Sequence, residues 1–332
     1  MKRRLFLILA LVCCLAILGS STAFGAPKKV AWVPSVIGIP FFALESEGFK
    51  EAFKDFGYDL IYLGPEKGTP EEETEIINNL IIQKVDGIDL VPTDPEALNT
   101  ICKKAKDAGI KMIENGSRNM KGNVNISTII FPPDDVGKIL MDMGGNLIKF
   151  QGEFAILSAA ATSTGQNDWI AGMKKEFADS KYSKMKWVTT AYGDDLREKS
   201  YNEAVGLLRS YPNLKLIISP TTVGIAAAAA AVTDAGAVGK VLVTGLGLPS
   251  EMAAYIKNGA CPVAALWSPI DLGYFNAYVM HNLLTGQITG KAGEKFKAGR
   301  LGNYTIAEDG IVFFQRIFKF DKSNIADWEN RL

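Results

Sequence analysis

Short apolar runs alternate with amphipathic stretches along most of this chain. Lys29–Pro34 is an apolar run that stops at a proline, as expected for a strand buried on both faces of a sheet. Leu44–Phe56 then repeats apolar residues every three to four positions, which is the helical period, and Gly57 is a typical helix end. Because this alternation recurs as far as Leu284, the pattern predicts an α/β fold with parallel strands covered by helices.

The same periods delimit the other predicted elements. The predicted strands are Lys29–Pro34, Asp59–Leu63, Gly87–Val91, Lys111–Glu114, Glu153–Ala159, Lys186–Ala191, Leu214–Ser219, Val241–Thr244 and Val263–Trp267. The predicted helices are Leu44–Phe56, Thr69–Lys84, Pro95–Gly109, Asp134–Lys149, Gln166–Phe177, Leu196–Tyr211, Gly224–Gly236, Glu251–Asn258 and Ile270–Leu284. Thr69 is the expected N-cap of its helix, with Pro70 at the first helical position.

The number of strands favours two sheets over one. A single doubly wound sheet would need about ten strands, which is near the practical limit for open sheets. Two consecutive units of about 110–120 residues agree better with ordinary domain sizes. Phe131-Pro132-Pro133 is the expected crossing point, because prolines end strands and stiffen linkers. We therefore expect two doubly wound lobes, each with a parallel sheet.

Residues 1–25 have the layout of a secretory signal peptide. A basic start at residues 2–4 precedes the apolar segment Leu5–Leu18, and small residues follow it. Ala23 and Gly25 suit the −3 and −1 positions, so we expect cleavage before Ala26 and secretion of the mature chain, as for a bacterial-type signal.

Two membrane-bound alternatives exist for this segment. As a helix, its apolar part would reach only about 21 Å, which is short of a hydrocarbon core of roughly 30 Å. Cys13 and Cys14 could in principle carry a lipid, but both lie in mid-segment without the small residue expected before an acylated cysteine.

Composition and charge exclude several classes of protein. Lys and Arg total 36 against 36 Asp and Glu in 332 residues, whereas a nucleic-acid-binding protein normally carries a basic excess. The one histidine, His281, cannot by itself build a multi-histidine metal site, and no Ser/Asp constellation accompanies it. Cys102 and Cys261 are expected as buried free thiols, with a disulfide as the alternative. We predict no metal, no cofactor and no catalytic residue.

Loops at the carboxyl ends of the predicted strands locate a candidate site, because ligands of open α/β sheets bind there. These loops carry aromatic rings and neutral hydrogen-bonding groups. Together they suit a small polyhydroxylated molecule, whose C–H faces stack on rings while its hydroxyls are paired. The candidates in these loops are Phe41, Phe42, Glu114, Asn115, Gln166, Asn167, Thr221 and Trp267.

Some of these residues have a structural alternative. Glu114 could instead pair with Arg118, and Asn167 could cap a helix. Trp267 suits a buried hinge as well as a stacking platform. Three nearby residues also have two possible roles. Trp169 either lines the ligand site or packs in the core, and the core is favoured. Asp194 and Asp195 either reach the ligand or belong to a solvated loop.

An ordered set of stretches resembles a known family. The stretches are Val30-Ala31-Trp32-Val33-Pro34, Ile39-Pro40-Phe41-Phe42, Ile76-Ile77-Asn78-Asn79, Val91-Pro92-Thr93-Asp94, Thr164-Gly165-Gln166-Asn167-Asp168-Trp169, Ser219-Pro220-Thr221, Leu266-Trp267 and Gly310-Ile311-Val312-Phe313. This set resembles the periplasmic sugar-binding proteins of ABC importers, of the ribose-binding type (periplasmic binding protein class I). Within that type it is most similar to the subgroup that binds rhamnose or autoinducer-2.

The resemblance implies two lobes joined by three crossing segments, with a cleft that closes on the ligand. The implied N-terminal lobe is 27–131 plus 268–300, and the implied C-terminal lobe is 132–267 plus 301–332. Ser35 and Pro220 join the candidate ligand contacts because they stand at positions where relatives bind their ligand.

This chain departs from both kinds of relative at their charged ligand contacts. Autoinducer-2 binders have a lysine at the position of Ser35 and aspartates at those of Gly116 and Gly165. Ribose binders have an aspartate–arginine pair at Gly116-Ser117 and an aspartate near Gly247. The resemblance therefore implies a class of ligand, a neutral sugar or polyol, and not an individual one.

These observations predict a binding protein. We expect a monomeric periplasmic solute-binding protein that captures a small neutral sugar or polyol-like ligand and delivers it to a membrane ABC permease. An autoinducer-2-type signal binder or receptor is the alternative. A secreted carbohydrate-active enzyme is less favoured, because the chain lacks GxSxG, a phosphate loop and metal-ligand spacing, although distant carboxylates could still converge.

Overall fold

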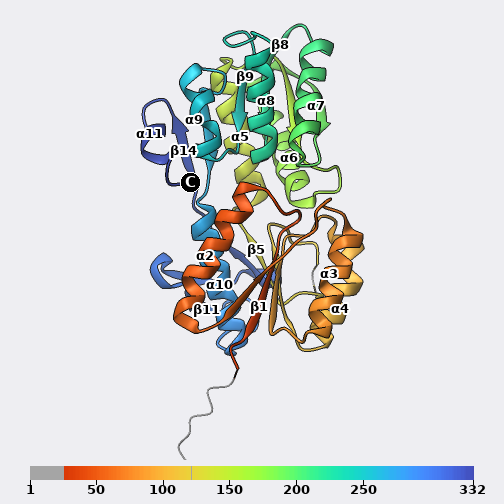
Figure 1. Ribbon diagram of the computed structural model, residues 1–332. Coiled ribbons are helices and arrows are strands. Elements are labelled where there is room, and N and C mark those ends of the chain that lie inside the picture. Colours follow the sequence, from red (N-terminus) through yellow and green to blue (C-terminus); the bar gives the residue numbers. More distant parts are fainter. Residues whose placement is uncertain (1–25, 121) are drawn as a thin grey trace, which may run out of the picture.

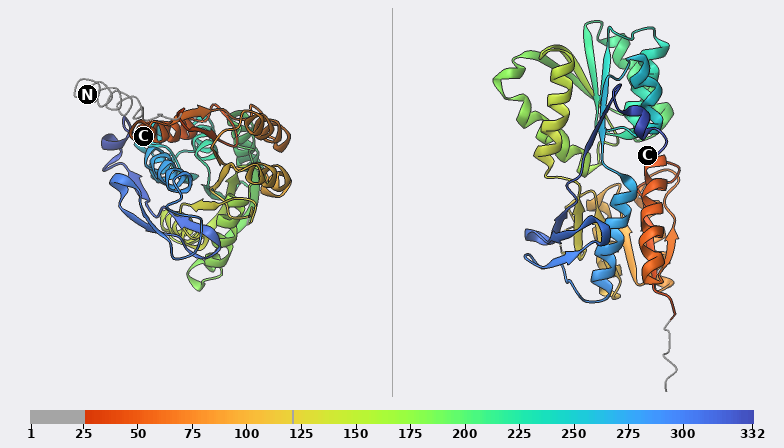
Figure 2. Two further views of the ribbon diagram at one scale, coloured as in Figure 1. Left: turned by 90° about the horizontal axis from the view of Figure 1, so that it is seen from below. Right: turned by 90° about the vertical axis from the view of Figure 1, so that its left-hand side faces the viewer.

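The chain forms two α/β lobes that stack end to end, with the C-terminus near their junction (Figures 1 and 2). The computed structural model describes residues 26–120 and 122–332. The predicted signal peptide, residues 1–25, lies outside the described residues. Each lobe has its own parallel sheet, so the predicted two-sheet fold is confirmed and the single-sheet alternative is wrong. Among the described residues, no helix combines the length and apolar character needed to cross a bilayer.

The N-terminal lobe is built on a six-stranded parallel sheet in the order β13-β5-β4-β3-β1-β2. Its strands are β1 (Lys29–Val33), β2 (Asp59–Tyr62), β3 (Gly87–Leu90), β4 (Lys111–Asn115), β5 (Ile126–Ile129) and β13 (Ile311–Phe313). Its helices are α2 (Pro40–Phe56), α3 (Pro70–Ile82), α4 (Pro95–Asp107) and α10 (Pro269–Leu284). A small hairpin of β11 (Lys295–Lys297) and β12 (Asn303–Thr305) follows α10.

Strand β1 explains why this sheet is covered on both faces. Val30 and Trp32 belong to the core beneath α2 and α10, whereas Ala31 and Val33 belong to the core beneath α3 and α4. Successive side chains of a strand point to opposite faces, so a continuous apolar run requires helices on both.

The C-terminal lobe has a four-stranded parallel sheet in the order β7-β6-β8-β9. Its strands are β6 (Gln151–Ser158), β7 (Lys184–Tyr192), β8 (Leu214–Ser219) and β9 (Leu242–Gly245). Its helices are α5 (Pro133–Leu147), α6 (Thr164–Phe177), α7 (Arg197–Ser210), α8 (Thr222–Asp234), α9 (Pro249–Asn258) and the short α11 (Ile325–Trp328). Helix α5 packs on α6, and α7 packs on α8. Beside β9, β10 (Val263–Leu266) pairs antiparallel with β14 (Phe318–Asp321).

The chain crosses between the lobes three times, between β5 and α5, between β10 and α10, and between β13 and β14. The first crossing runs through the predicted Phe131-Pro132-Pro133 stretch. The assignment of residues 301–332 to the second lobe is wrong in part, because β13 pairs with β5 in the first sheet. Only from β14 onward does the tail pair with a strand of the second lobe.

One local difference from the predicted elements matters for the site. Helix α2 begins at Pro40 and not at Leu44, because proline suits the first helical position. Phe41 and Phe42 therefore lie in the first turn of α2. The expected cap is confirmed, since the Thr69 hydroxyl accepts a hydrogen bond from the backbone N–H of Glu72 at 3.3 Å.

Both cysteines named above, in α4 and before β10, are buried free thiols, so the disulfide alternative is wrong.

Candidate functional site

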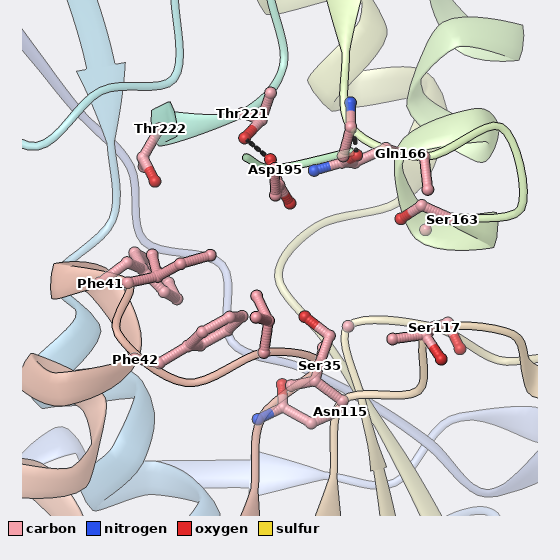
Figure 3. A pocket seen from close by; sticks show the side chains of 18 of the residues that line it. Ser35, Phe41, Phe42, Asn115, Ser117, Ser163, Gln166, Asp195, Thr221 and Thr222 are labelled. Carbon is pink, nitrogen blue, oxygen red and sulfur yellow. Dashed lines mark hydrogen bonds between the residues drawn. The ribbon is translucent and has the colours of Figure 1, made fainter. Parts of the chain in front are cut away.

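A cavity of about 200 Å³ lies between the two lobes. It is lined by the carboxyl ends of strands from both sheets, where ligands of parallel α/β folds bind. Figure 3 shows side chains of the N-terminal lobe, among them Ser35, Phe42 and Asn115, facing Gln166 and Asp195 of the C-terminal lobe. The cavity is therefore built by both lobes together.

Most of the predicted contact residues line this cavity. Those that do are Ser35, Phe41, Phe42, Asn115, Gln166, Pro220, Thr221 and Trp267. Glu114 and Asn167 do not, and their surroundings show why.

Glu114 is a structural residue, which corrects the prediction that it contacts the ligand. Its side chain is fully buried. Its carboxylate accepts hydrogen bonds from the backbone N–H of Asn119 (2.8 Å) and Met120 (3.1 Å) and from the hydroxyls of Ser127 (2.8 Å) and Ser117. These bonds fold the loop that follows β4. A strand alternates its side chains, so Glu114 faces away from the cavity whereas Asn115 faces it.

Asn167 also serves the local fold and not the cavity. Its Nδ2 donates to the carbonyl oxygen of Ala161 at 2.7 Å, which fixes the loop that enters α6. Arg118 pairs with Asp168 of the other lobe, Nε to Oδ2 at 3.7 Å, and not with Glu114 as the alternative held.

Aromatic rings form the hinge side of the cavity. Trp267 makes edge-to-face contacts with Phe41 and Trp169, at centroid distances of 6.1 and 5.9 Å. Phe42 continues the group, 5.6 Å from Phe41. Trp169, expected in the core, is buried and also lines the cavity. The buried Nε1 of Trp267 has no partner within residues 26–120 and 122–332, so a molecule in the cavity could accept its hydrogen bond.

The C-terminal lobe contributes a linked polar group centred on Asp195. The Thr221 hydroxyl donates to its carboxylate, as Figure 3 shows, and the Gln166 amide is a further partner. Gln166 is itself fixed, because the backbone N–H of Ala159 donates to its Oε1 at 3.3 Å. Burial raises the pKa of Asp195 to about 6, and the negative charge of Asp194 adds to the shift.

The loop that carries this group is strained. Asp194 and Asp195 both have φ of 54°, in the left-handed region that non-glycine residues rarely adopt. Such strain collects at functional sites, where the surrounding structure maintains it.

The N-terminal lobe contributes a second polar group, at the base of the cavity. Asn115 Nδ2 donates to Glu45 Oε1 at 2.8 Å and to Asp89 Oδ1 at 3.2 Å. Burial raises the pKa of both carboxyls, and the charge of Asp89 further raises that of Glu45. Glu45, Asp194 and Asp195 are the charged residues of the cavity lining, which contains no cationic side chain. Such a lining disfavours an anionic ligand.

The sequence-based candidates omitted Glu45 and left Asp195 open. A signal for Glu45 existed: it stands at helical spacing before Phe49 and Ala52, so an acid occupies the apolar stripe of α2. Asp195 follows a strand at the correct end of its sheet. Nothing in the sequence indicates that its carboxylate accepts a bond from Thr221, because that contact depends on the packing of two loops.

The two lobes also touch each other directly beside the cavity. Gly165 of α6 lies so close to Gly116 that a Cβ atom there would be 2.4 Å from the Gly116 carbonyl oxygen. Val36 and Ile39 of one lobe also share an apolar cluster with Val223 of the other. This arrangement is a closed one.

Two lobes, three crossings and an interlobe cavity define a two-lobed binding protein. The chain belongs to the periplasmic binding protein domain family, which matches residues 30–288. The resemblance found in the sequence is thus confirmed.

Three relatives illustrate the range of this family. An ABC transporter solute-binding protein from Clostridium phytofermentas, with bound L-rhamnose, is 37% identical, covers 93% of this chain and all of that one, and has a TM-score of 0.88. The D-ribose/D-allose-binding protein of Pseudomonas aeruginosa is 26% identical over 86% of this chain and 92% of its own length. LsrB from Clostridium saccharobutylicum, in complex with AI-2, shares the fold at 22% identity, a TM-score of 0.85 and coverage of 90% and 99%.

Proposed function

We propose that this chain is the periplasmic solute-binding protein of an ABC importer for a small neutral sugar or polyol. The observation that carries the proposal is the lining of the interlobe cavity. Rings stand beside amides, hydroxyls and carboxylates, and no cation is among the lining residues. Rings suit the C–H faces of a sugar, and the polar groups suit its hydroxyls.

The ligand class follows from the size and charge of the cavity. Its volume of about 200 Å³ is below the roughly 300–1,000 Å³ of drug-sized sites, which suits a single sugar ring. Because its charged residues are all acids, sugar phosphates and sugar acids are disfavoured. L-Rhamnose is the first sugar to test, since a relative with 37% identity holds it. D-Ribose and D-allose come next.

Ligand capture would act by population shift. A ligand that contacts both polar groups stabilises the closed form selectively, because only closure brings Asn115 and Asp195 to the same cavity. About 5.5 kcal/mol of differential affinity would convert a mostly open population to a mostly closed one. The membrane permease would then recognise the closed outline, which both lobes form.

Binding would leave the sugar chemically unchanged. The histidine of the chain, His281, is stacked on Phe56 at 3.9 Å and placed 3.1 Å from the Tyr58 hydroxyl, so it does not reach the cavity. The cavity carboxyls of Glu45 and Asp195 are engaged as hydrogen-bond acceptors. The autoinducer-2 alternative is disfavoured, because a Cβ atom added at Gly165 would lie 2.4 Å from the Gly116 carbonyl oxygen, so the closed contact leaves no room for the aspartate that those binders have at the position of Gly165.

A thermal-shift panel tests the proposal. Residues 26–332 are heated with L-rhamnose, D-ribose, D-allose, a sugar phosphate and a sugar acid. A sugar present at 100 times its Kd should add about 2.7 kcal/mol to the unfolding free energy. We expect stabilisation by at least one neutral sugar and none by the anions. Stabilisation by the anions alone, or conversion of a sugar to a product, would contradict the proposal.

A further inference from the structure

Asn115 stands at the boundary between the ligand cavity and a buried acid pair. Its side chain lines the cavity, yet both of its amide hydrogens are directed away from it. One goes to Glu45 on α2 and the other to Asp89 on β3. Figure 3 shows the oxygen of Asn115 on the cavity side and its nitrogen on the other side. A primary amide has two donor hydrogens, so none remains for a ligand.

The carboxyls that hold this amide are themselves enclosed. Glu45 is 1% exposed and Asp89 is 0% exposed. A second amide, Asn276 of α10, donates to Glu45 Oε1 at 3.4 Å and so helps to fix that carboxyl. In the described part of the chain, the second oxygens, Glu45 Oε2 and Asp89 Oδ2, have no hydrogen-bond partner. Both acids therefore present an accepting oxygen to Asn115 and keep the other free to hold a proton.

The opposite orientation of the amide is strongly disfavoured. Turning Asn115 over would place its oxygen against the accepting oxygens of Glu45 and Asp89, away from water. A buried acceptor that faces acceptors loses its hydrogen bond at a penalty that reduces the population of such a state by about 5- to 150-fold. The cavity therefore meets only the oxygen of this amide.

We infer that Glu45 and Asp89 fix Asn115 as an acceptor-only amide, which selects ligands with a hydroxyl donor at that point of the cavity. This inference rests on the proposed function. The inference extends the proposed function, because it makes Glu45 and Asp89 positioning residues that act on the ligand through Asn115. A ligand whose matching group accepts but cannot donate would face the Asn115 oxygen without a hydrogen bond.

Fluorinated sugars test whether a ligand hydroxyl must donate a hydrogen bond, because a fluorine in its place cannot donate one. The experiment titrates L-rhamnose and its singly fluorinated derivatives into residues 26–332 by calorimetry. At one ring position we expect fluorination to weaken binding about 10- to 100-fold. In Asp89→Leu the amide is free to turn one N–H to the cavity, so this penalty should fall below about threefold.

One conservative variant serves as the matched control. Asp89→Asn keeps an accepting oxygen of the same reach, so the fluorine penalty should stay as in the natural chain. A purely structural role for the acid pair would instead lower the affinity for L-rhamnose and for its fluorinated derivatives equally. An unchanged penalty in Asp89→Leu would overturn the inference while leaving the proposed function intact.

A second measurement needs no sugar. In the ligand-free protein, both Asn115 side-chain amide hydrogens should exchange slowly by NMR, and one should exchange at least tenfold faster in Asp89→Leu. Rapid exchange of both in the natural chain would overturn the proposed fixing of the amide. If no sugar of the panel binds, the proposed function fails and the ligand-selecting half of the inference fails with it, whereas slow exchange would still support the fixed amide.

Discussion

Gly165→Ala probes the contact that closes the cavity. The added methyl carbon would lie 2.4 Å from the Gly116 carbonyl oxygen, where an ordinary contact needs 3.4 to 4 Å. Both groups are attached to backbone in different lobes, so relief of about 1 Å must come from parting the lobes or distorting the chain. Overpacking of this kind costs about 1–3 kcal/mol. Because the penalty falls on the closed form, we expect sugar affinity to fall about 5- to 150-fold.

The assay compares calorimetric Kd values for the tightest sugar of the panel with urea unfolding of the ligand-free chain. The matched control is Gly206→Ala in α7, where an added Cβ would meet no atom within 4 Å. The control should bind as the natural chain does and gain up to about 1 kcal/mol of stability, as expected for alanine in a helix. Gly165→Ala should weaken binding with little change in the free energy of unfolding. Unchanged affinity in Gly165→Ala would refute the closing role of this contact.

Three further changes test individual parts of the site. Glu114→Gln should lower the unfolding free energy by about 1–3 kcal/mol in urea and leave sugar affinity within about twofold, because Glu114 bonds to the loop after β4 and to Ser127 of the neighbouring strand β5; a selective loss of affinity would restore it as a ligand contact. Phe41→Ala should weaken sugar binding by about 1–3 kcal/mol by calorimetry if the ring stacks on the ligand, and an unchanged Kd would remove that role. Asp195 holds its proton more tightly when folded, with a pKa of about 6 against 3.8, so its contribution to stability is present below about pH 4 and is lost as the pH rises through 6. Asp195→Asn should therefore stabilise the ligand-free chain at pH 7.5, by at most about 3 kcal/mol, and change little at pH 4; equal effects at both pH values would contradict this.

The two lobes could be predicted well from the sequence, because the patterns that produce their strands and helices are local. Continuous apolar strands and amphipathic helices can each be identified from a short stretch of sequence, and so can the helix caps at Thr69 and Gly57. Strand β5 was not predicted because Ser127 and Thr128 interrupt its apolar pattern. Ser127 is buried there because its hydroxyl donates to Glu114, thirteen residues away. Strand β13 has only three residues and depends on pairing with β5, which is remote in sequence.

The candidate site was also predictable only where it depends on local sequence. The strand-end rule selects the loops that converge, and so it finds Phe41, Asn115 and Trp267 without any motif. It does not tell which of two adjacent residues faces the cavity: Glu114 and Asn115 were both predicted as ligand contacts, and only Asn115 lines the cavity. That choice depends on the pleat of β4. The partners of Asn115 come from α2 and β3, so no window of sequence around it contains them.

The central claim is that the two lobes hold a neutral sugar unchanged. It is tested most directly by calorimetric titration of residues 26–332 with L-rhamnose, followed by mass spectrometry of the recovered sugar. With the other neutral sugars of the panel titrated in the same way, the account predicts one molecule bound per chain for at least one of them and full recovery of its original mass. Preferential binding of a sugar phosphate, or recovery of a product of different mass, would contradict it.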